Sequence, residues 1–337
     1  MERDAGHDAS LLPAAVAPSV TIHCPPGRGR GLLATRRGKS PFPSSQVSGY
    51  KDGMMLALKI AVGAALAYAI VLAGAYYLQR TLMYFPARER VAPAAAGLTG
   101  VDELVLSTPD GAKVIAWYGR AAPGKPTLLY FHGNGGSLVT RAERIGRYLA
   151  RGYGVFMMTY RGYGGSTGQP SERANVADAK LAFDTLVASG VEPRSIVIYG
   201  ESIGSGVAVQ VATEKPARGL ILDAPYTSVT EVAAAAYPLL PVRTFLTDRY
   251  ETMRHIGRIR QPLLVVHGEQ DRVIPVEMGR AVHAAAPEPK KLVTFPRAGH
   301  SDHHLHGSYE AIFDWLDSLV GAERDSDSPP IRKEIGR

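Results

Sequence analysis

The chain has 337 residues, of which 45% are hydrophobic and 20% charged, proportions that suit a globular protein with one α/β domain of about 200 to 250 residues. Part of the formal net charge of +7 lies in the first 53 residues, and no basic run interleaved with aromatic residues follows, so we expect no nucleic-acid partner. Cys24 is the single cysteine, which excludes a disulfide framework and a cysteine-based zinc site.

The first segment, residues 1–53, is rich in Pro, Gly, Ser and Arg and shows no apolar periodicity. Met54 and Met55 stand directly before an apolar segment, so either of them is a candidate start of the protein. We therefore predict that residues 1–53 are a disordered tail or are not translated.

An uncharged run follows from Ile60 to Leu78, and about 20 helical residues span a hydrocarbon core of roughly 30 Å. Tyrosines near its end suit a membrane interface. We predict a single transmembrane signal anchor over residues 54–79. Because Lys and Arg are more numerous before the run than just after it, the N-terminus is expected in the cytoplasm and the main domain on the non-cytoplasmic side.

Two alternatives to this anchor remain open. Lys59, a short apolar region and Ala73-Gly74-Ala75 together match a cleavable signal peptide, which would give a secreted or periplasmic protein. The run also has the length of a buried helix, although such a helix normally has one polar face and this run has none.

From Val101 onwards, short apolar runs alternate with helical patterns. The predicted strands are residues 103–107, 113–118, 127–131, 155–160, 195–200, 219–224, 262–267 and 291–295. Pro109-Asp110-Gly111 between the first two predicts an antiparallel hairpin. The later strands, apolar throughout and joined by helices, predict a mostly parallel, doubly wound α/β sheet.

The predicted domain covers residues 80–321 and is followed by a polar tail, residues 322–337. Residues 226–261 interrupt the alternation of strands and helices. We predict that they form a short lid between the sixth and seventh strands.

The segment Gly200-Glu201-Ser202-Ile203-Gly204 follows a predicted strand and precedes a helix of small residues. This is the G-x-S-x-G motif in its strand–turn–helix context, which presents the serine hydroxyl at the edge of the sheet. The motif predicts that Ser202 is a nucleophile. The helix N-terminus beside it favours a developing negative charge.

A nucleophilic serine needs a base, and the base needs an orienting carboxylate. Asp271 follows the seventh predicted strand and His300 follows the eighth, and such loops gather at one edge of a doubly wound sheet. We predict Asp271 as the acid and His300 as the base. Asp223, at the end of the sixth strand, is the rival acid.

The run His132-Gly133-Asn134-Gly135-Gly136 follows the third predicted strand and suits a second oxyanion donor. We predict that the backbone N–H groups of Ile203 and Asn134 form the oxyanion hole, with Gly135 as the alternative to Asn134. No cofactor and no metal are predicted. His303, His304 and His306 lack an accompanying carboxylate or cysteine set and are interpreted as a solvated loop.

Taken together, the motifs LMYFP after the anchor, HGNGG, RGYGGSTG, GESIG, GEQDRVIP and AGHSD resemble those of the Bem46-type α/β hydrolases. These enzymes are similar to the mammalian α/β-hydrolase-domain 13 and 17 groups. The resemblance covers about residues 80–320 and implies the α/β-hydrolase fold and a membrane-anchored serine hydrolase.

From the motifs and the resemblance we expect hydrolysis of a small acyl ester or thioester through an acyl-enzyme intermediate. A serine aminopeptidase acting on small peptides is the enzymatic alternative. A membrane-anchored, non-catalytic scaffold is the alternative from another class. The complete set of motifs argues against a scaffold, which need not retain all four parts of a catalytic site.

Overall fold

The computed structural model describes residues 44–326, with side chains described for residues 49–320. The predicted tail at residues 1–43 and the last part of the C-terminal tail, residues 327–337, lie outside the described residues. The chain divides into two units, residues 1–62 and residues 63–337. Residues 63–83 of the first helix belong to the second unit.

Helix α1 runs from Ser44 to Met83, so it begins before the predicted start at Met54 and includes residues 44–53 of the predicted tail. The stretch between Pro43 and Pro86 contains no proline to interrupt a helix. Residues Gly49–Met83 are long and apolar enough to cross a membrane, and none of their most apolar window is buried.

The core of the domain is an eight-stranded sheet with the order β10-β9-β8-β7-β4-β6-β3-β2. The strands are β2 (Val101–Ser107), β3 (Lys113–Gly119), β4 (Thr127–Phe131), β6 (Gly154–Met158), β7 (Ile196–Glu201), β8 (Gly219–Asp223), β9 (Leu263–Gly268) and β10 (Lys290–Phe295). β3 pairs antiparallel with both β2 and β6, and the other pairs are parallel. The predicted mostly parallel sheet with an antiparallel N-terminal hairpin is confirmed.

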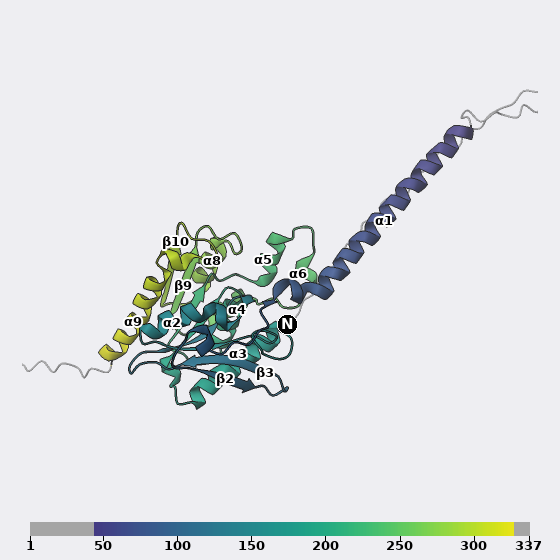
Figure 1. Cartoon of the computed structure of the whole chain (residues 1–337). Helices are drawn as coiled ribbons and strands as arrows, with labels where there is room; N and C mark the ends of the chain where they lie inside the picture. The colour runs from purple at the N-terminus through teal and green to yellow at the C-terminus, as the bar shows by residue number, and fades with distance from the viewer. Residues whose placement is uncertain (1–43, 327–337) are drawn as a thin grey trace, which may run out of the picture. The chain divides into compact units, whose positions relative to one another are not determined.

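Helices cover both faces of this sheet (Figure 1). The core on one face contains residues of α3 (Glu172–Ala188), α4 (Ile203–Ala212) and α8 (Val276–Ala285). The other face is covered by α2 (Ala142–Ala150) and α9 (Ser308–Ser326). Successive residues of β4 enter opposite cores, which is the two-residue period of a strand buried on both sides.

The insertion between β8 and β9 occupies the place of the predicted lid. It folds into three short α-helices, α5 (Val229–Ala236), α6 (Val242–Phe245) and α7 (Thr252–His255), followed by a 3-10 helix, η4 (Ile256–Arg258). Of these, α5 and α6 lie beside the C-terminal part of α1 (Figure 1).

A second, two-stranded sheet joins the end of α1 to the glycine-rich loop. β1 (Phe85–Pro86) pairs in parallel with β5 (Gly135–Gly136). Strands of two residues leave no periodic pattern in a sequence, and neither was predicted.

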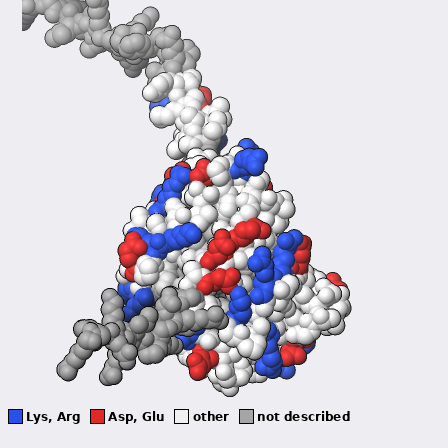
Figure 2. Space-filling view, turned by 90° about the vertical axis from the view of Figure 1, so that its left-hand side faces the viewer, with Lys and Arg blue, Asp and Glu red and all other residues white. Residues whose placement is uncertain are grey.

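Charge is distributed unevenly along the chain. Figure 2 shows acidic and basic side chains interspersed over one face of the domain, whereas α1 presents mainly uncharged surface. The large apolar residues from Leu56 to Leu82 that are exposed on α1 account for this difference.

Candidate active site

Ser202 stands in the tight turn between β7 and α4. Its backbone has φ 52° and ψ −120°, a strained conformation for any residue with a side chain. A Cβ atom at Gly200 would lie 2.4 Å from the Gly204 carbonyl oxygen, and one at Gly204 would lie 2.1 Å from the Phe131 carbonyl oxygen. Strand and helix can therefore approach this closely only with glycine on both sides of the serine.

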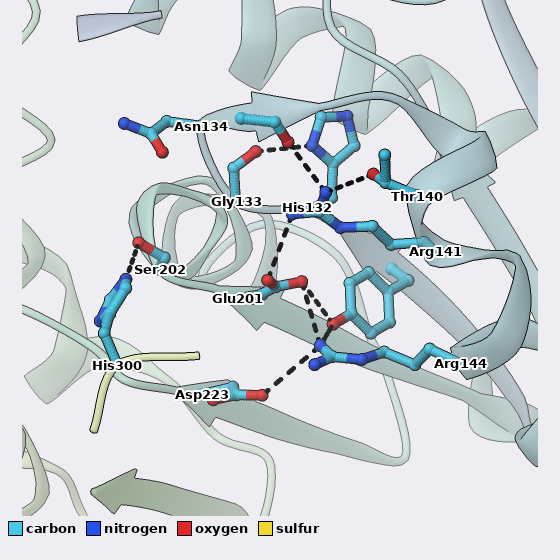
Figure 3. Close-up of polar contacts among 12 residues, drawn as sticks. His132, Gly133, Asn134, Thr140, Arg141, Arg144, Glu201, Ser202, Asp223 and His300 are labelled. Carbon is cyan, nitrogen blue, oxygen red and sulfur yellow. Dashed lines mark hydrogen bonds and ion pairs between the residues drawn. The ribbon is translucent and has the colours of Figure 1, made fainter. Parts of the chain in front are cut away.

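The three side chains predicted as a triad lie in hydrogen-bonding order. His300 Nε2 is 3.0 Å from Ser202 Oγ, and His300 Nδ1 is 2.7 Å from Asp271 Oδ2. Figure 3 shows the imidazole facing the serine. The second carboxylate oxygen of Asp271 accepts the backbone N–H groups of Val273 and Ile274, at 2.8 Å each. These two bonds fix the carboxylate in the loop after β9.

Asp271 is ionised at neutral pH. Burial acts to raise the pKa of its carboxyl, but hydrogen bonds from His267 and His300 outweigh burial and hold that pKa well below its ordinary value. An ionised carboxylate can only accept hydrogen bonds, so the proton of this contact belongs to Nδ1 of His300. In the neutral imidazole with this proton on Nδ1, Nε2 carries the lone pair, 3.0 Å from the hydroxyl oxygen of Ser202.

His267 is a partner of Asp271 that was not predicted from the sequence. Its Nε2 lies 3.3 Å from Asp271 Oδ2 and 2.8 Å from the carbonyl oxygen of Ile274. The side chain is fully buried at the end of β9. The available signal was a histidine near the end of an otherwise apolar strand, just before the loop that carries Asp271.

Three hydrogen bonds at Asn134 hold the glycine-rich loop after β4. The side chain of Asn134 donates to the Met83 carbonyl (3.1 Å). The backbone carbonyl of Asn134 accepts from Phe85 N (3.0 Å) and Tyr163 Oη (2.6 Å). The backbone N–H of Asn134 and that of Ile203, the first residue of α4, donate no hydrogen bond to any described residue. Both residues line the same cavity as Ser202.

A largely buried charge cluster lies beside the turn that carries Ser202 (Figure 3). The carboxylate of Glu201 lies 3.3 Å from Arg141 and 3.0 Å from Arg144, and it accepts the hydroxyl of Tyr130 at 2.8 Å. Arg141 also donates to the Gly135 carbonyl at 2.8 Å. The cluster therefore links the residue before Ser202 to the glycine-rich loop. Its members, far apart in the sequence, were not predicted.

Glu201 stays ionised within this cluster. Burial acts to raise the pKa of its carboxyl, but the charges of Arg144 and Arg141 outweigh burial and hold that pKa at about 2. A permanent carboxylate in turn keeps both guanidinium groups in place.

Asp223, the rival acid, belongs to this cluster and forms no hydrogen bond or ion pair with His300. Its oxygens lie 2.8 Å from His303 Nε2, 3.8 Å from Arg144 Nη1 and 2.6 Å from the hydroxyl of Tyr199. Burial acts to lower the pKa of His303, but the carboxylate of Asp223 outweighs it and raises that pKa.

The interpretation of the histidine run 303–306 as solvated is therefore wrong for His303, which is buried. The carboxylate at the end of β8 is itself buried and needs a partner that can carry positive charge, and His303 provides one. No group of three or more His, Cys, Asp or Glu side chains able to hold a metal occurs among the described residues.

A cavity of about 330 Å³ opens beside Ser202. It is walled by the end of α1, by the insertion and by the loop after β9. The residues that line it are Ala75, Gln79, Leu82, Met83, Phe85, Asn134, Ser202, Ile203, Tyr226, Val229, Val232, Ala233, Ala236, Tyr237, Leu240, Val242, Phe245, Leu246, Val273 and Ile274. None of these described lining residues is charged, so the cavity suits an uncharged, apolar group.

Residues 122–247 match a family model described as serine aminopeptidase, S33. The chain is 39% identical over 230 residues to an uncharacterised protein of Mycobacterium tuberculosis, covering 67% of this chain and 82% of that protein. It is 31% identical over 291 residues to the protein bem46 of Schizosaccharomyces pombe, covering 81% of this chain and 95% of that protein. It is 32% identical over 215 residues to human α/β hydrolase domain-containing protein 17B, covering 62% of this chain and 72% of that protein.

Solved structures share the architecture at lower sequence identity. The Pyrococcus furiosus esterase Pf2001 superposes with a TM-score of 0.56 at 18% identity, over 71% of this chain and 98% of that one. An α-β hydrolase from Vibrio vulnificus gives 0.57 at 21% identity, over 68% and 88%. At such identities these likenesses establish the fold alone.

Proposed function

This chain belongs to the α/β-hydrolase family, in the group of the bem46 protein, and from that premise we propose that it is a membrane-anchored serine hydrolase of carboxylic esters or thioesters. Ser202 is the nucleophile, His300 the base and Asp271 the acid. The observation that carries the proposal is the position of His300, within hydrogen-bonding distance of both Ser202 Oγ and the ionised Asp271.

The reaction follows from these contacts. His300 Nε2 takes the proton of Ser202 Oγ as that oxygen attacks the acyl carbonyl, and Asp271 stabilises the imidazolium that forms. The free N–H groups of Ile203 and Asn134 donate to the oxyanion. The imidazolium then protonates the leaving alcohol or thiol. Water, deprotonated by the same imidazole, releases the acid and restores the serine.

The apolar cavity favours esters and thioesters over peptides. An aminopeptidase has to bind the charged α-ammonium group of its substrate, and a buried cation needs a carboxylate partner. The described lining of the cavity beside Ser202 offers no carboxylate. A peptidase remains the second candidate because of the description of the matching family model. A non-catalytic scaffold would give no reason for a strained serine facing a histidine.

We assign α1 as the membrane anchor, because Gly49–Met83 is long and apolar enough to span a bilayer. The N-terminus is placed in the cytoplasm and the hydrolase domain on the non-cytoplasmic side, following the excess of Lys and Arg before the apolar run. Cleavage after Ala75 and release of the domain is the alternative.

The test is activity of the full chain in vesicles on two substrate panels, one of p-nitrophenyl esters and the corresponding thioesters, the other of aminoacyl p-nitroanilides. We expect kcat/KM to rise from acetyl to butyryl or hexanoyl, because each buried methylene is worth about 0.8 kcal/mol. Negligible ester and thioester rates together with efficient cleavage of the anilides would establish the peptidase instead.

A further inference from the structure

The insertion carries an uncharged tip, residues 232–242, called here the apolar tip. No residue from Val232 to Val242 is charged. The residues that flank it, Glu231 and Arg243, form a two-point ion pair at 2.9 and 2.8 Å. Within the tip, the side chain of Leu239 is 84% exposed. Charges are thus confined to the base of the projection, while its end presents exposed apolar side chains, Tyr237 and Leu239, of the kind that marks a site of membrane or protein interaction.

The apolar tip lies against the predicted membrane-spanning run of α1. The hydroxyl of Tyr68 donates to the Leu239 carbonyl at 2.7 Å. Farther along the helix, Gln79 accepts from both the backbone N–H and the hydroxyl of Thr247, at 2.8 and 2.9 Å. From Tyr68 to Gln79 the helix rises about 16 Å at 1.5 Å per residue. The insertion therefore accompanies α1 over a length comparable to half the hydrocarbon core.

The polar contacts between α1 and the insertion suit a position of the apolar tip within the hydrocarbon core. Arg80 is the first charged residue of α1 after the uncharged run, and it forms two hydrogen bonds with Asp248, at 3.0 and 3.2 Å. A charged residue at the end of an apolar run marks the level of the membrane interface. Toward the membrane from Arg80, the carbonyl of Leu239 has its hydrogen bond from Tyr68. A backbone carbonyl in hydrocarbon needs such an internal partner.

The cavity beside Ser202 lies between these same two elements. Ala75 and Gln79 line it from α1, Ala236 and Leu240 line it from the apolar tip, and Ser202 belongs to the same lining. An acyl chain that enters between helix and tip reaches the nucleophile without crossing charged surface. The anchor is thus a wall of the substrate site.

We infer that the apolar tip is embedded in the bilayer leaflet beside α1, and that the cavity admits single-chain acyl esters directly from that leaflet to Ser202. The inference rests on the proposed esterase activity and on α1 as the anchor. Each methylene of an acyl chain favours an apolar phase about fourfold. A decanoyl ester therefore resides mainly in the leaflet, where the entrance lies, while an acetyl ester stays in water.

The first test measures the depth of the tip and is independent of catalysis. The full chain carrying Cys24→Ser and Leu239→Cys is labelled with a fluorophore and reconstituted in phosphatidylcholine vesicles. We expect quenching by lipids brominated on their acyl chains and protection from iodide in the water. A matched variant, Val105→Cys, places the label on the exposed surface of β2 and should show the reverse. Iodide quenching at position 239 overturns the inference.

The second test measures the route of entry. Leu239→Asp places a charge on the tip at a residue that does not line the cavity. We expect kcat/KM for p-nitrophenyl decanoate in the vesicles to fall about tenfold or more, since a carboxylate is expelled from hydrocarbon. The value for the water-soluble acetate should stay within twofold, and Val105→Asp should change neither.

The two esters separate failure of the inference from failure of the proposed function. Equal rates of Leu239→Asp and the parent on decanoate overturn the leaflet route, provided that the parent hydrolyses acetate through Ser202. If the parent hydrolyses neither ester, the proposed function fails, and position 239 is still tested by the label.

Discussion

The side-chain amide of Asn134 donates a hydrogen bond to the carbonyl of Met83, 3.1 Å away. Met83 is the last residue of α1, so this bond ties the loop proposed as an oxyanion hole to the end of the proposed anchor. The neighbouring bond from Phe85 N to the Asn134 carbonyl, 3.0 Å long, strengthens the tie. The position of the loop thus depends on the helix.

Replacing Asn134 by alanine tests this dependence. The backbone N–H proposed as donor is retained, but the bond to Met83 is lost, so we expect kcat on p-nitrophenyl acetate to fall about tenfold. Outright loss of an oxyanion donor costs about 10² to 10³. KM should change little, and an unchanged kcat would mean that the bond does not position the donor.

Replacing Ser202 by alanine should lower kcat by roughly 10⁴-fold or more, and a fluorophosphonate should label the parent but not the variant. Ser205 offers a matched control, because it is a buried serine in the same segment whose hydroxyl has no hydrogen-bond partner among the described residues. Ser205→Ala should keep both labelling and activity. Labelling of Ser202→Ala would assign the nucleophile elsewhere.

Two aspartate substitutions, Asp271→Asn and Asp223→Asn, should have different effects: one mainly on kcat and the other mainly on the free energy of unfolding. The first change should lower kcat by roughly 10⁴, as when an acid no longer orients the imidazole. The second removes the partner of the buried His303 and should lower the free energy of unfolding by about 3 to 5 kcal/mol, with a much smaller effect on kcat of the folded fraction. The opposite ranking in kcat would make Asp223 the acid.

The carboxylate of Glu201 should make the stability depend on pH in acid. Its pKa is about 2 in the folded protein and about 4.3 in the unfolded chain. Because the pKa is lower in the folded protein, the carboxylate stabilises the fold at every pH above the pKa of the unfolded chain, here by roughly 3 kcal/mol. This contribution is lost as the pH falls from about 5 to 2. Glu201→Gln should unfold more readily at pH 7 and should show a shallower dependence of Tm on pH in that window. Equal slopes for parent and variant would show that the carboxylate is not stabilised by its arginines.

The full chain should sediment with membranes and resist extraction at alkaline pH, because α1 crosses the bilayer in our proposal. Protease should reach the hydrolase domain only from the non-cytoplasmic side. A soluble mature protein that begins at Tyr76 would establish the signal-peptide alternative.

Local sequence patterns predicted the fold well, because buried parallel strands are short apolar runs whatever they contact. The turn around Ser202 was equally visible, since its glycines are required by contacts within a few residues and with β4. Asp271 and His300 were expected from the chain order of the motifs. His300 lies within hydrogen-bonding distance of both Asp271 and Ser202, and the catalytic roles of these residues stay predictions. All of these features depend on residues close in sequence or on a repeated topology.

The missed features depend on long-range packing. Arg141 and Arg144 contact Glu201 only after β4 and β7 pair. The residues next to an arginine in the sequence do not indicate which carboxylate it will bind. His303 looked solvated among polar neighbours, yet the end of β8 brings Asp223 against it. The start of α1 at Ser44 was missed because a polar, glycine-containing segment has weak helix propensity.

Only Tyr84 separates the end of α1 at Met83 from β1 at Phe85, and Tyr84 is buried, with its hydroxyl 2.9 Å from that of Tyr250 and 3.2 Å from Asp248. The proposed anchor therefore continues into the domain without any slack. A domain joined to its anchor by a long flexible linker could reach substrates in the surrounding solution and in an adjacent membrane. With α1 as the membrane anchor that we propose, the site is held at one distance from the bilayer, and the substrates within its reach are those that diffuse laterally in that same membrane.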